Sequence, residues 1–232
     1  MKNLVILTGA GMSVESGLST FRGAGGMWDK YPIEKVATIE GYYDNPKLVI
    51  DFYNDRRKQL LSVQPNHGHE VIAELEKNFN VTVITQNVDN LHERAGSTNV
   101  IHLHGELTKV TSSNDPNNPK FIEELDPSNY EVKIGDKAQD GSQKRPFIVW
   151  FGEAVPKIDD AIESVRKADI FVVIGTSLNV YPAAGLLNYV SPNVPVYVID
   201  PNELPINSSK YFFIKMGASA GMDELSKKLF KN

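Results

Sequence analysis

Six short apolar runs, each rich in β-branched residues, recur along the chain. Runs with little alternation between apolar and polar positions are typical of strands buried on both faces of a parallel sheet. Between them lie segments whose spacing predicts helices, and this alternation predicts the α/β class. The expected strands are residues 3–8, 81–85, 99–104, 146–151, 169–175 and 194–200, and the expected helices are residues 45–62, 67–78, 157–168, 182–190 and 221–231.

Two segments interrupt the alternation. Residues 23–79 contain two helical patterns but no strand, and residues 108–145 are polar and rich in Asn, Asp, Pro and Ser, which is typical of loops. We expect a single domain over residues 1–232 in which these insertions build a small second lobe. The large lobe would comprise residues 1–29, 80–107 and 146–232, and the small lobe residues 30–79 and 108–145.

The composition narrows the function classes. A net charge of −5 argues against a nucleic-acid surface, which needs a basic stripe to neutralise phosphates. The chain has no cysteine, which excludes disulfides, thiolate metal sites and a cysteine nucleophile. The apolar run at the N-terminus is too short for a signal peptide and no longer one follows, so we expect a cytoplasmic protein without a membrane partner.

Several strands end in residues suited to a nucleotide. Gly9, Ala10 and Gly11 follow the first strand, where glycines let the backbone approach a pyrophosphate, although Val14 stands where the dinucleotide fingerprint has a third glycine. A tight turn between a strand and a helix would explain these residues equally well. The same two interpretations hold for the segment Gly175-Thr176-Ser177 and for Asp200, which could take ribose hydroxyls.

Two further strand ends carry polar side chains. Gln86, Asn87 and Asp89 suit ribose hydroxyls and a carboxamide, with helix capping as the alternative. His102 and His104 alternate on one strand, where a metal site is the less favoured interpretation. His104 could act as a general base because a histidine pKa lies near neutral pH, with a structural role, the more common one for a strand histidine, as the alternative.

Five motifs, taken in order along the chain, resemble those of the sirtuins, the NAD-dependent protein lysine deacylases. They read GAGMSVESGLSTFRG, TQNVDNLHERAG, HLHGEL, RPFIVWFGEAVP and IGTSLNVYPAAG, and they cover nearly the whole chain. Five motifs in one order are far more specific than any of them alone. The resemblance implies a sirtuin fold, with a Rossmann-type large lobe and a small lobe, and a cleft that NAD and an acyl-lysine peptide enter from opposite sides.

The resemblance also implies a role for each matching residue, with His104 as the general base and Asn87 beside it. Nicotinamide and O-acyl-ADP-ribose would be the products. The peptide would add to strand edges at Val149, Trp150, Phe151 and Gly152 and at Asn179, Val180 and Tyr181. NAD would be bound by Gly9, Ala10, Gly11, Ser13, Phe21, Arg22, Trp28, Gln86, Asn87, Asp89, Gly175, Thr176, Ser177, Asp200, Pro201, Asn202 and Ala218.

The small lobe departs from the family pattern. Family members usually carry four cysteines there that bind a structural zinc, whereas Thr111, Ser112 and Ser113 stand where the first is expected. We therefore expect no zinc, and a lobe held by other contacts.

Tyr53 and Arg56 match the Tyr-x-x-Arg pair that lines the acyl pocket in the sirtuin subgroup that removes acidic acyl groups. Three residues apart on a helix, they share a face. A guanidinium pairs with both oxygens of a carboxylate, and tyrosine adds a hydroxyl. We expect succinyl and malonyl groups to be removed, with acetyl also accepted, and we expect the neighbouring Arg57 and Lys58 to be solvated.

Two other functions are considered. A sirtuin-fold ADP-ribosyltransferase would use the same NAD cleft, and a non-catalytic module would only bind NAD or peptide. The presence of His104 together with Tyr53 and Arg56 favours the deacylase over the ADP-ribosyltransferase. The non-catalytic module is disfavoured by the complete set of Gln86, Asn87, Asp89 and His104. We expect a monomer that acts on acyl-lysine proteins or peptides.

Overall fold

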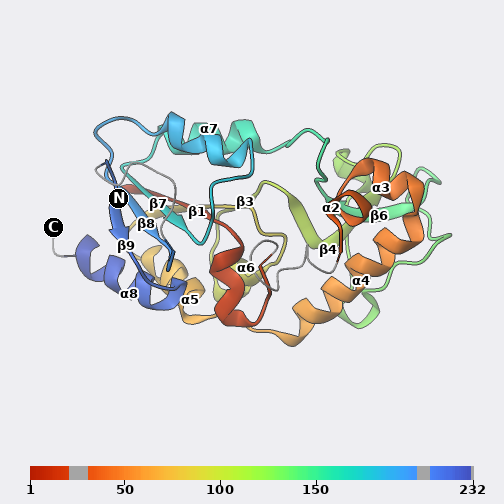
Figure 1. Ribbon diagram of the computed structural model, residues 1–232, viewed down its shortest axis with the longest axis horizontal. Helices are drawn as coiled ribbons and strands as arrows, with labels where there is room; N and C mark the ends of the chain where they lie inside the picture. The colour runs from red at the N-terminus through yellow and green to blue at the C-terminus, as the bar shows by residue number, and fades with distance from the viewer. Residues whose placement is uncertain (21–30, 203–209, 231–232) are drawn as a thin grey trace.

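The larger part of the molecule is a six-stranded sheet in the order β3-β2-β1-β7-β8-β9, with every neighbouring pair parallel (Figure 1). The computed structural model describes residues 1–20, 31–202 and 210–230. The predicted α/β class is confirmed. The strands are β1 (Asn3–Thr8), β2 (Asn80–Thr85), β3 (Val100–His102), β7 (Ile170–Ile174), β8 (Val196–Ile199) and β9 (Phe212–Ile214).

Helices cover both faces of this sheet, which explains why its strands are apolar without alternation. On one face, α5 (His67–Leu75) packs beside α8 (Ala218–Leu229). On the other face, α7 (Ile158–Arg166) packs beside the 3-10 helix η4 (Ala183–Tyr189). Every residue of β7 is consequently buried. Among the described residues, no helix is long and apolar enough to cross a membrane.

A second lobe lies beside the large one, around a three-stranded antiparallel sheet in the order β5-β4-β6 (Figure 1). It has an apolar cluster of its own, in which α4 packs on β4 and β6. Its elements are α2 (Ile33–Val36), α3 (Ile39–Asp44), α4 (Pro46–Ser62), β4 (Gly105–Ser112), η2 (Pro119–Phe121), β5 (Glu123–Glu124), η3 (Pro127–Asn129) and β6 (Lys144–Ile148).

The antiparallel sheet corrects one sequence prediction. The run at residues 146–151 was expected to be a strand of the parallel sheet, but it contributes to β6 in the small lobe. The two ends of the long insertion pair with each other, Val110 with Pro146 and Ser112 with Lys144. Antiparallel strands need no crossover, so this pairing is the shorter connection.

The position of helix α5 corrects a second sequence prediction. Residues 30–79 were assigned to the small lobe, yet α5 buries its apolar face against the parallel sheet and α8. The sequence also missed short elements that single-sequence periodicity detects poorly. Besides α2, α3, β4, β5 and β9, these include η1 (Ala10–Ser16) after β1 and α6 (Leu91–Ala95) after β2.

Candidate active site

One large cavity lies between the lobes. Its volume is about 780 Å³, within the range of small-molecule sites. The loops after β1, β2, β7 and β8 reach it at the carboxyl edge of the large sheet, and α4 closes it from the small lobe. Most residues predicted from the sequence line it: Gly9, Ala10, Gly11, Tyr53, Arg56, Gln86, Asn87, His104, Val149, Trp150, Phe151, Gly152, Gly175, Thr176, Ser177, Asn179, Val180, Tyr181, Asp200, Pro201, Asn202 and Ala218.

Two predicted residues, Ser13 and Asp89, do not line the large cavity but lie behind the residues that do. They border a smaller adjoining cavity of about 20 Å³, and the Ser13 hydroxyl donates to the Asp89 carboxylate at 3.0 Å. The Asn87 side-chain amide donates to the Gly9 carbonyl oxygen at 3.0 Å and to the Ser13 hydroxyl at 3.2 Å. Their contacts therefore hold Asn87 in place. The predicted residues Phe21, Arg22 and Trp28 lie outside the described residues.

The glycines of the first loop pack against the loop after β7. A Cβ built on Gly11 would stand 2.6 Å from the Cα of Gly175, and a Cβ on Gly9 would stand 2.6 Å from the Cβ of Thr176. The Gly11 N–H donates to the Gly175 carbonyl oxygen at 2.8 Å. Glycine is required at both positions because the two loops are in contact. As a result, backbone atoms form this part of the cavity lining.

The loop after β2 is tied to both of its neighbours. The Gln86 side-chain amide donates to the Thr176 hydroxyl at 2.9 Å, and the Asn87 N–H donates to the Thr85 hydroxyl at 3.0 Å. Asn87 is buried. Both amides are therefore fixed at the cavity, and the predicted capping alternative does not describe Asn87, whose side chain bonds back to the β1 loop.

His104 follows β3 and faces the cavity with a defined tautomer. Its Nδ1 lies 2.9 Å from the Gln86 carbonyl oxygen, which can only accept, so Nδ1 carries the proton and Nε2 has a free lone pair. Burial lowers the pKa of His104, and the Gln86 carbonyl opposes this in part. A neutral imidazole of this kind can accept a proton at Nε2 near neutral pH.

His102 has a different environment and does not form a metal site with His104. Its Nε2 lies 2.7 Å from a Glu93 carboxylate oxygen, and its Nδ1 lies 3.1 Å from the Asn87 carbonyl oxygen. Burial lowers the pKa of His102, but the Glu93 carboxylate outweighs it, so the pKa is raised. Across the described parts of the chain, no group of three or more His, Asp or Glu residues could hold a metal ion.

Asp200 closes a turn at the end of β8, next to the cavity. It is largely buried, and its Oδ1 accepts from the Asn202 N–H at 2.8 Å. The turn alternative was therefore correct in part, because this oxygen is already bonded within its own loop.

Tyr53 and Arg56 share one face of α4, as predicted, and both line the cavity. The Tyr53 hydroxyl accepts a hydrogen bond from the Trp150 indole Nε1 at 3.0 Å. Arg56 donates to the Gln59 side-chain oxygen at 2.6 Å. Burial lowers the pKa of Arg56, and the Asp89 carboxylate opposes this, so the guanidinium remains charged.

Arg57 contradicts its predicted solvation. It is 2 % exposed, its Nε donates to the Leu107 carbonyl oxygen at 2.8 Å, and its Nη1 donates to the Asn54 side chain at 2.9 Å. Burial lowers its pKa to about 10. The reason is β4, which lies against this face of α4 and was not expected from the sequence. Lys58, the next residue along α4, is exposed as predicted.

The predicted peptide edges are only partly open. The N–H groups of Val149 and Phe151 already donate to the carbonyl oxygens of His104 and Ala37, each at 2.9 Å. The side chains of Phe151 and Tyr181 are nevertheless exposed, at 42 % and 76 %. The two rings and the remaining main-chain groups are therefore the parts of these edges that stay open to a ligand.

Sequence reasoning missed much of the apolar wall, which includes Phe52, Val88, Leu107 and Ile148. Leu107 and Ile148 belong to β4 and β6, whose pairing could not be seen in advance. The apolar positions of GELTKV, at Leu107 and Val110, are the one signal that could have indicated a strand there.

Comparisons with known proteins agree on one family. The family model described as "Sir2 family" matches residues 9–182. A protein of Bacteroides thetaiotaomicron named "NAD-dependent protein deacylase" is 69 % identical over 230 residues, which is 99 % of this chain and 98 % of that protein.

Solved structures are similar over the same length. The complex "Sir2 homologue S24A mutant-ADP ribose" is 40 % identical, with a TM-score of 0.90 over 99 % of this chain and 92 % of the other. The complex "Sir2-p53 peptide-NAD+" is 27 % identical, with a TM-score of 0.77 over 99 % of this chain and 94 % of the other.

Proposed function

The chain belongs to the Sir2 family, and from that premise we propose that it is an NAD-dependent protein lysine deacylase that prefers succinyl or malonyl groups and also accepts acetyl. One observation carries the preference: Tyr53 and Arg56 line the same cavity as His104. The similar chains solved with ADP-ribose, and with a p53 peptide and NAD, support NAD and a protein segment as the two substrates.

The residues at the sheet edge fit NAD. Gly9 to Gly11 and Gly175 to Ser177 give a wall of backbone against which phosphates and sugars can lie, while Gln86 and Asn87 are held at the cavity by bonds to the neighbouring loops. When bound, NAD would supply the ribose that takes the acyl group on a hydroxyl oxygen; nicotinamide would leave from the ribose carbon, one water would be consumed, and free lysine and O-acyl-ADP-ribose would be the other products.

His104 would move a proton in this reaction. Its Nδ1 proton is held by the Gln86 carbonyl, so Nε2 is the atom that can take a proton from a ribose hydroxyl. The apolar lining at Phe52, Val88 and Ile148 would exclude water from the reacting atoms.

Tyr53 and Arg56 would bind the carboxylate of the acyl group. In this largely buried position, a carboxylate recovers the hydrogen bonds that it loses to water only if a cation and a donor face it. An acetyl group leaves both unused. Because only an acidic acyl group gains the ion pair and the charge-assisted hydrogen bond, such a site can discriminate between the two acyl groups.

The test replaces Arg56 by methionine. The Arg56→Met variant keeps an unbranched chain of similar bulk and removes the charge, so we expect kcat/KM for a succinyl-lysine peptide to fall roughly 100-fold while that for the matched acetyl peptide changes by roughly a few-fold. Peptide mass and O-acyl-ADP-ribose formation give the rates. Lys58→Met is the matched control, since Lys58 is an exposed cation on the same helix.

Other outcomes would contradict the proposal. Equal losses for the succinyl and acetyl peptides would mean that Arg56 is part of the scaffold. If acetyl-, succinyl- and malonyl-lysine peptides all stay intact while protein gains the mass of ADP-ribose, the enzyme is an ADP-ribosyltransferase.

We also propose that the enzyme works as a monomer in the cytoplasm, where NAD is available, and that it acts on acyl-lysine proteins. Light scattering coupled to size-exclusion chromatography tests the first point, with a mass near the 25.8 kDa of one chain as the expected result.

A further inference from the structure

The hydrogen bond between Tyr53 and Trp150 has a fixed direction. An indole N–H can only donate, so the Tyr53 oxygen must accept it. A phenol has one proton of its own, and none of the described residues accepts the Tyr53 proton. Both side chains line the cavity. The hydroxyl is thus left with its proton available to a ligand.

We propose that Trp150 is a specificity-determining positioning residue: its indole N–H holds the Tyr53 hydroxyl as a donor directed at the carboxylate of an acidic acyl group. This inference rests on the proposed function, because it concerns how the same pocket recognises succinyl and malonyl groups. It adds a residue that acts through Tyr53.

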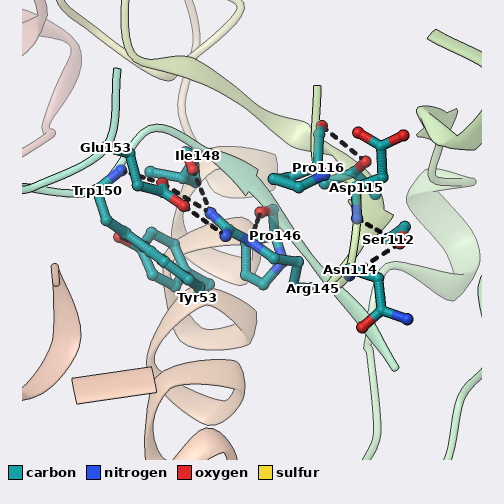
Figure 2. Close-up of polar contacts among 11 residues, drawn as sticks. Tyr53, Ser112, Asn114, Asp115, Pro116, Arg145, Pro146, Ile148, Trp150 and Glu153 are labelled. Carbon is teal, nitrogen blue, oxygen red and sulfur yellow. Dashed lines mark hydrogen bonds and ion pairs between the residues drawn. The ribbon is translucent and has the colours of Figure 1, made fainter. Parts of the chain in front are cut away.

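Trp150 is itself held in place by an ion pair behind it. Figure 2 shows Arg145 donating to both carboxylate oxygens of Glu153, at 2.7 and 3.0 Å, and to the Ile148 carbonyl oxygen at 2.7 Å. The Arg145 guanidinium carbon lies 3.5 Å from the centroid of the Trp150 ring. Glu153 in turn accepts from the Trp150 backbone N–H at 2.8 Å.

This arrangement fixes Trp150 from two directions. Arg145 and Trp150 are 1 % and 2 % exposed, so both side chains are shielded from solvent. One ion pair restrains both the ring and the backbone of Trp150, and the indole N–H therefore reaches Tyr53 in one orientation.

The protonation state of Tyr53 agrees with a donor role. Burial raises the pKa of Tyr53 to about 12, and the bond from Trp150 opposes this only in part. The hydroxyl keeps its proton at working pH. A carboxylate can only accept hydrogen bonds, whereas the methyl group of an acetyl cannot use a donor. Trp150 should therefore influence acidic acyl groups more than acetyl.

The test is a double-mutant cycle. Trp150→Phe keeps an aromatic ring beside Arg145 and removes the N–H, so we expect the ratio of kcat/KM for succinyl-lysine to that for acetyl-lysine peptide to fall about tenfold. In a Tyr53→Phe background the same replacement should leave the ratio where Tyr53→Phe alone has set it. Tyr42→Phe is the matched control, because Tyr42 packs 5.0 Å from the Trp150 ring and does not line the cavity.

Two results would overturn the inference. If Trp150→Phe loses both activities equally, or lowers the ratio as much without the Tyr53 hydroxyl as with it, Trp150 only packs. The proposed function fails separately, because it requires a preference in the unmodified enzyme that Arg56→Met abolishes.

A measurement on the unmodified chain covers the case in which the variant does not fold. The ¹⁵N-labelled protein has two indole N–H signals, from Trp28 and Trp150. Titration with a succinyl-lysine peptide should shift one of them more than the acetyl peptide does, and Tyr53→Phe should move that same signal. Equal shifts with both peptides, or a signal that does not respond to Tyr53→Phe, would contradict the inference.

Discussion

His104 shows how one hydrogen bond can assign a chemical role. The Gln86 carbonyl holds the proton on Nδ1, and burial lowers the pKa of the ring, so the neutral form with a free Nε2 is the stable state at neutral pH. A base of this kind is active when unprotonated. A lowered pKa therefore extends its working range to more acidic solution.

The pH profile of deacetylation tests this directly. For an acetyl-lysine peptide, which adds no titrating carboxylate in its acyl group, kcat/KM should decline in acid with a midpoint below 6.5, the ordinary pKa of histidine. His104→Ala should abolish turnover, while NAD binding measured by calorimetry survives. A midpoint above 6.5, or turnover in the alanine variant, would remove His104 from the role of base.

At the scale of elements, a serine-centred cluster holds the end of β4 where the family pattern has its zinc cysteines. The Ser112 hydroxyl donates to Asp140 at 2.6 Å and accepts from the backbone N–H groups of Asn114 and Asp115, each at 3.0 Å; Figure 2 includes Ser112, Asn114 and Asp115. The Ser142 hydroxyl lies 2.9 Å from it. One hydroxyl thus joins both ends of the insertion to β4.

Removal of that hydroxyl should loosen the small lobe. In Ser112→Ala, two backbone N–H groups lose a buried acceptor, so we expect a loss of about 1–3 kcal/mol in the free energy of unfolding, with faster amide exchange over residues 108–145. Denaturant titration and hydrogen exchange measure the two effects. Ser128→Ala is the matched control, since the Ser128 hydroxyl bonds to Asp126 in an exposed turn.

Zinc content gives an independent check on the same lobe. We predict that the purified protein carries no stoichiometric zinc, because the described residues offer no metal-binding group and the chain has no cysteine. If elemental analysis found one zinc per chain, the serine cluster could not be the reason that the lobe is ordered.

The sequence predicted strand ends better than helix faces. His104 and the Gln86–Asn87 pair could be placed because apolar runs reveal where parallel strands stop, and ligands bind at that edge. Arg57 was assigned to solvent because the strand covering its side of α4 reads as a polar loop. Trp150 was read as a peptide-binding edge, and its bond to Tyr53 depends on two segments 97 residues apart. No local pattern reports such a contact.

For the whole molecule, two buried histidines contribute to the response to acid. His69 on α5 and His92 on α6 pack with ring centroids 4.7 Å apart, and the His92 Nε2 lies 3.2 Å from the Thr8 hydroxyl on β1. Burial lowers the pKa of His69 to about 4 and that of His92 well below its ordinary 6.5. At these two rings the folded protein therefore binds fewer protons than the unfolded chain below pH 6.5, so both rings favour unfolding in acid.

The sign and the size of this effect can be measured. The contribution of the neutral His69 ring to the free energy of unfolding is present in full above pH 6.5 and is lost as the pH falls toward 4. This loss amounts to roughly 3 kcal/mol. His102, whose pKa is raised, acts in the opposite direction, since its contribution is present below pH 6.5 and is lost as the pH rises. The net loss in acid should therefore be smaller than the two buried rings alone would give.

The His69→Gln variant separates the effect of the buried histidines on acid unfolding from that of the carboxylates. Glutamine can still accept from the Asn66 N–H, as His69 does in the capping box of α5, but it does not titrate. We expect the variant to be less stable at pH 7.5 and its unfolding free energy to decline less steeply between pH 6.5 and 4. Parallel slopes for the two proteins would show that carboxylates, rather than the histidine pair between α5 and α6, govern acid unfolding.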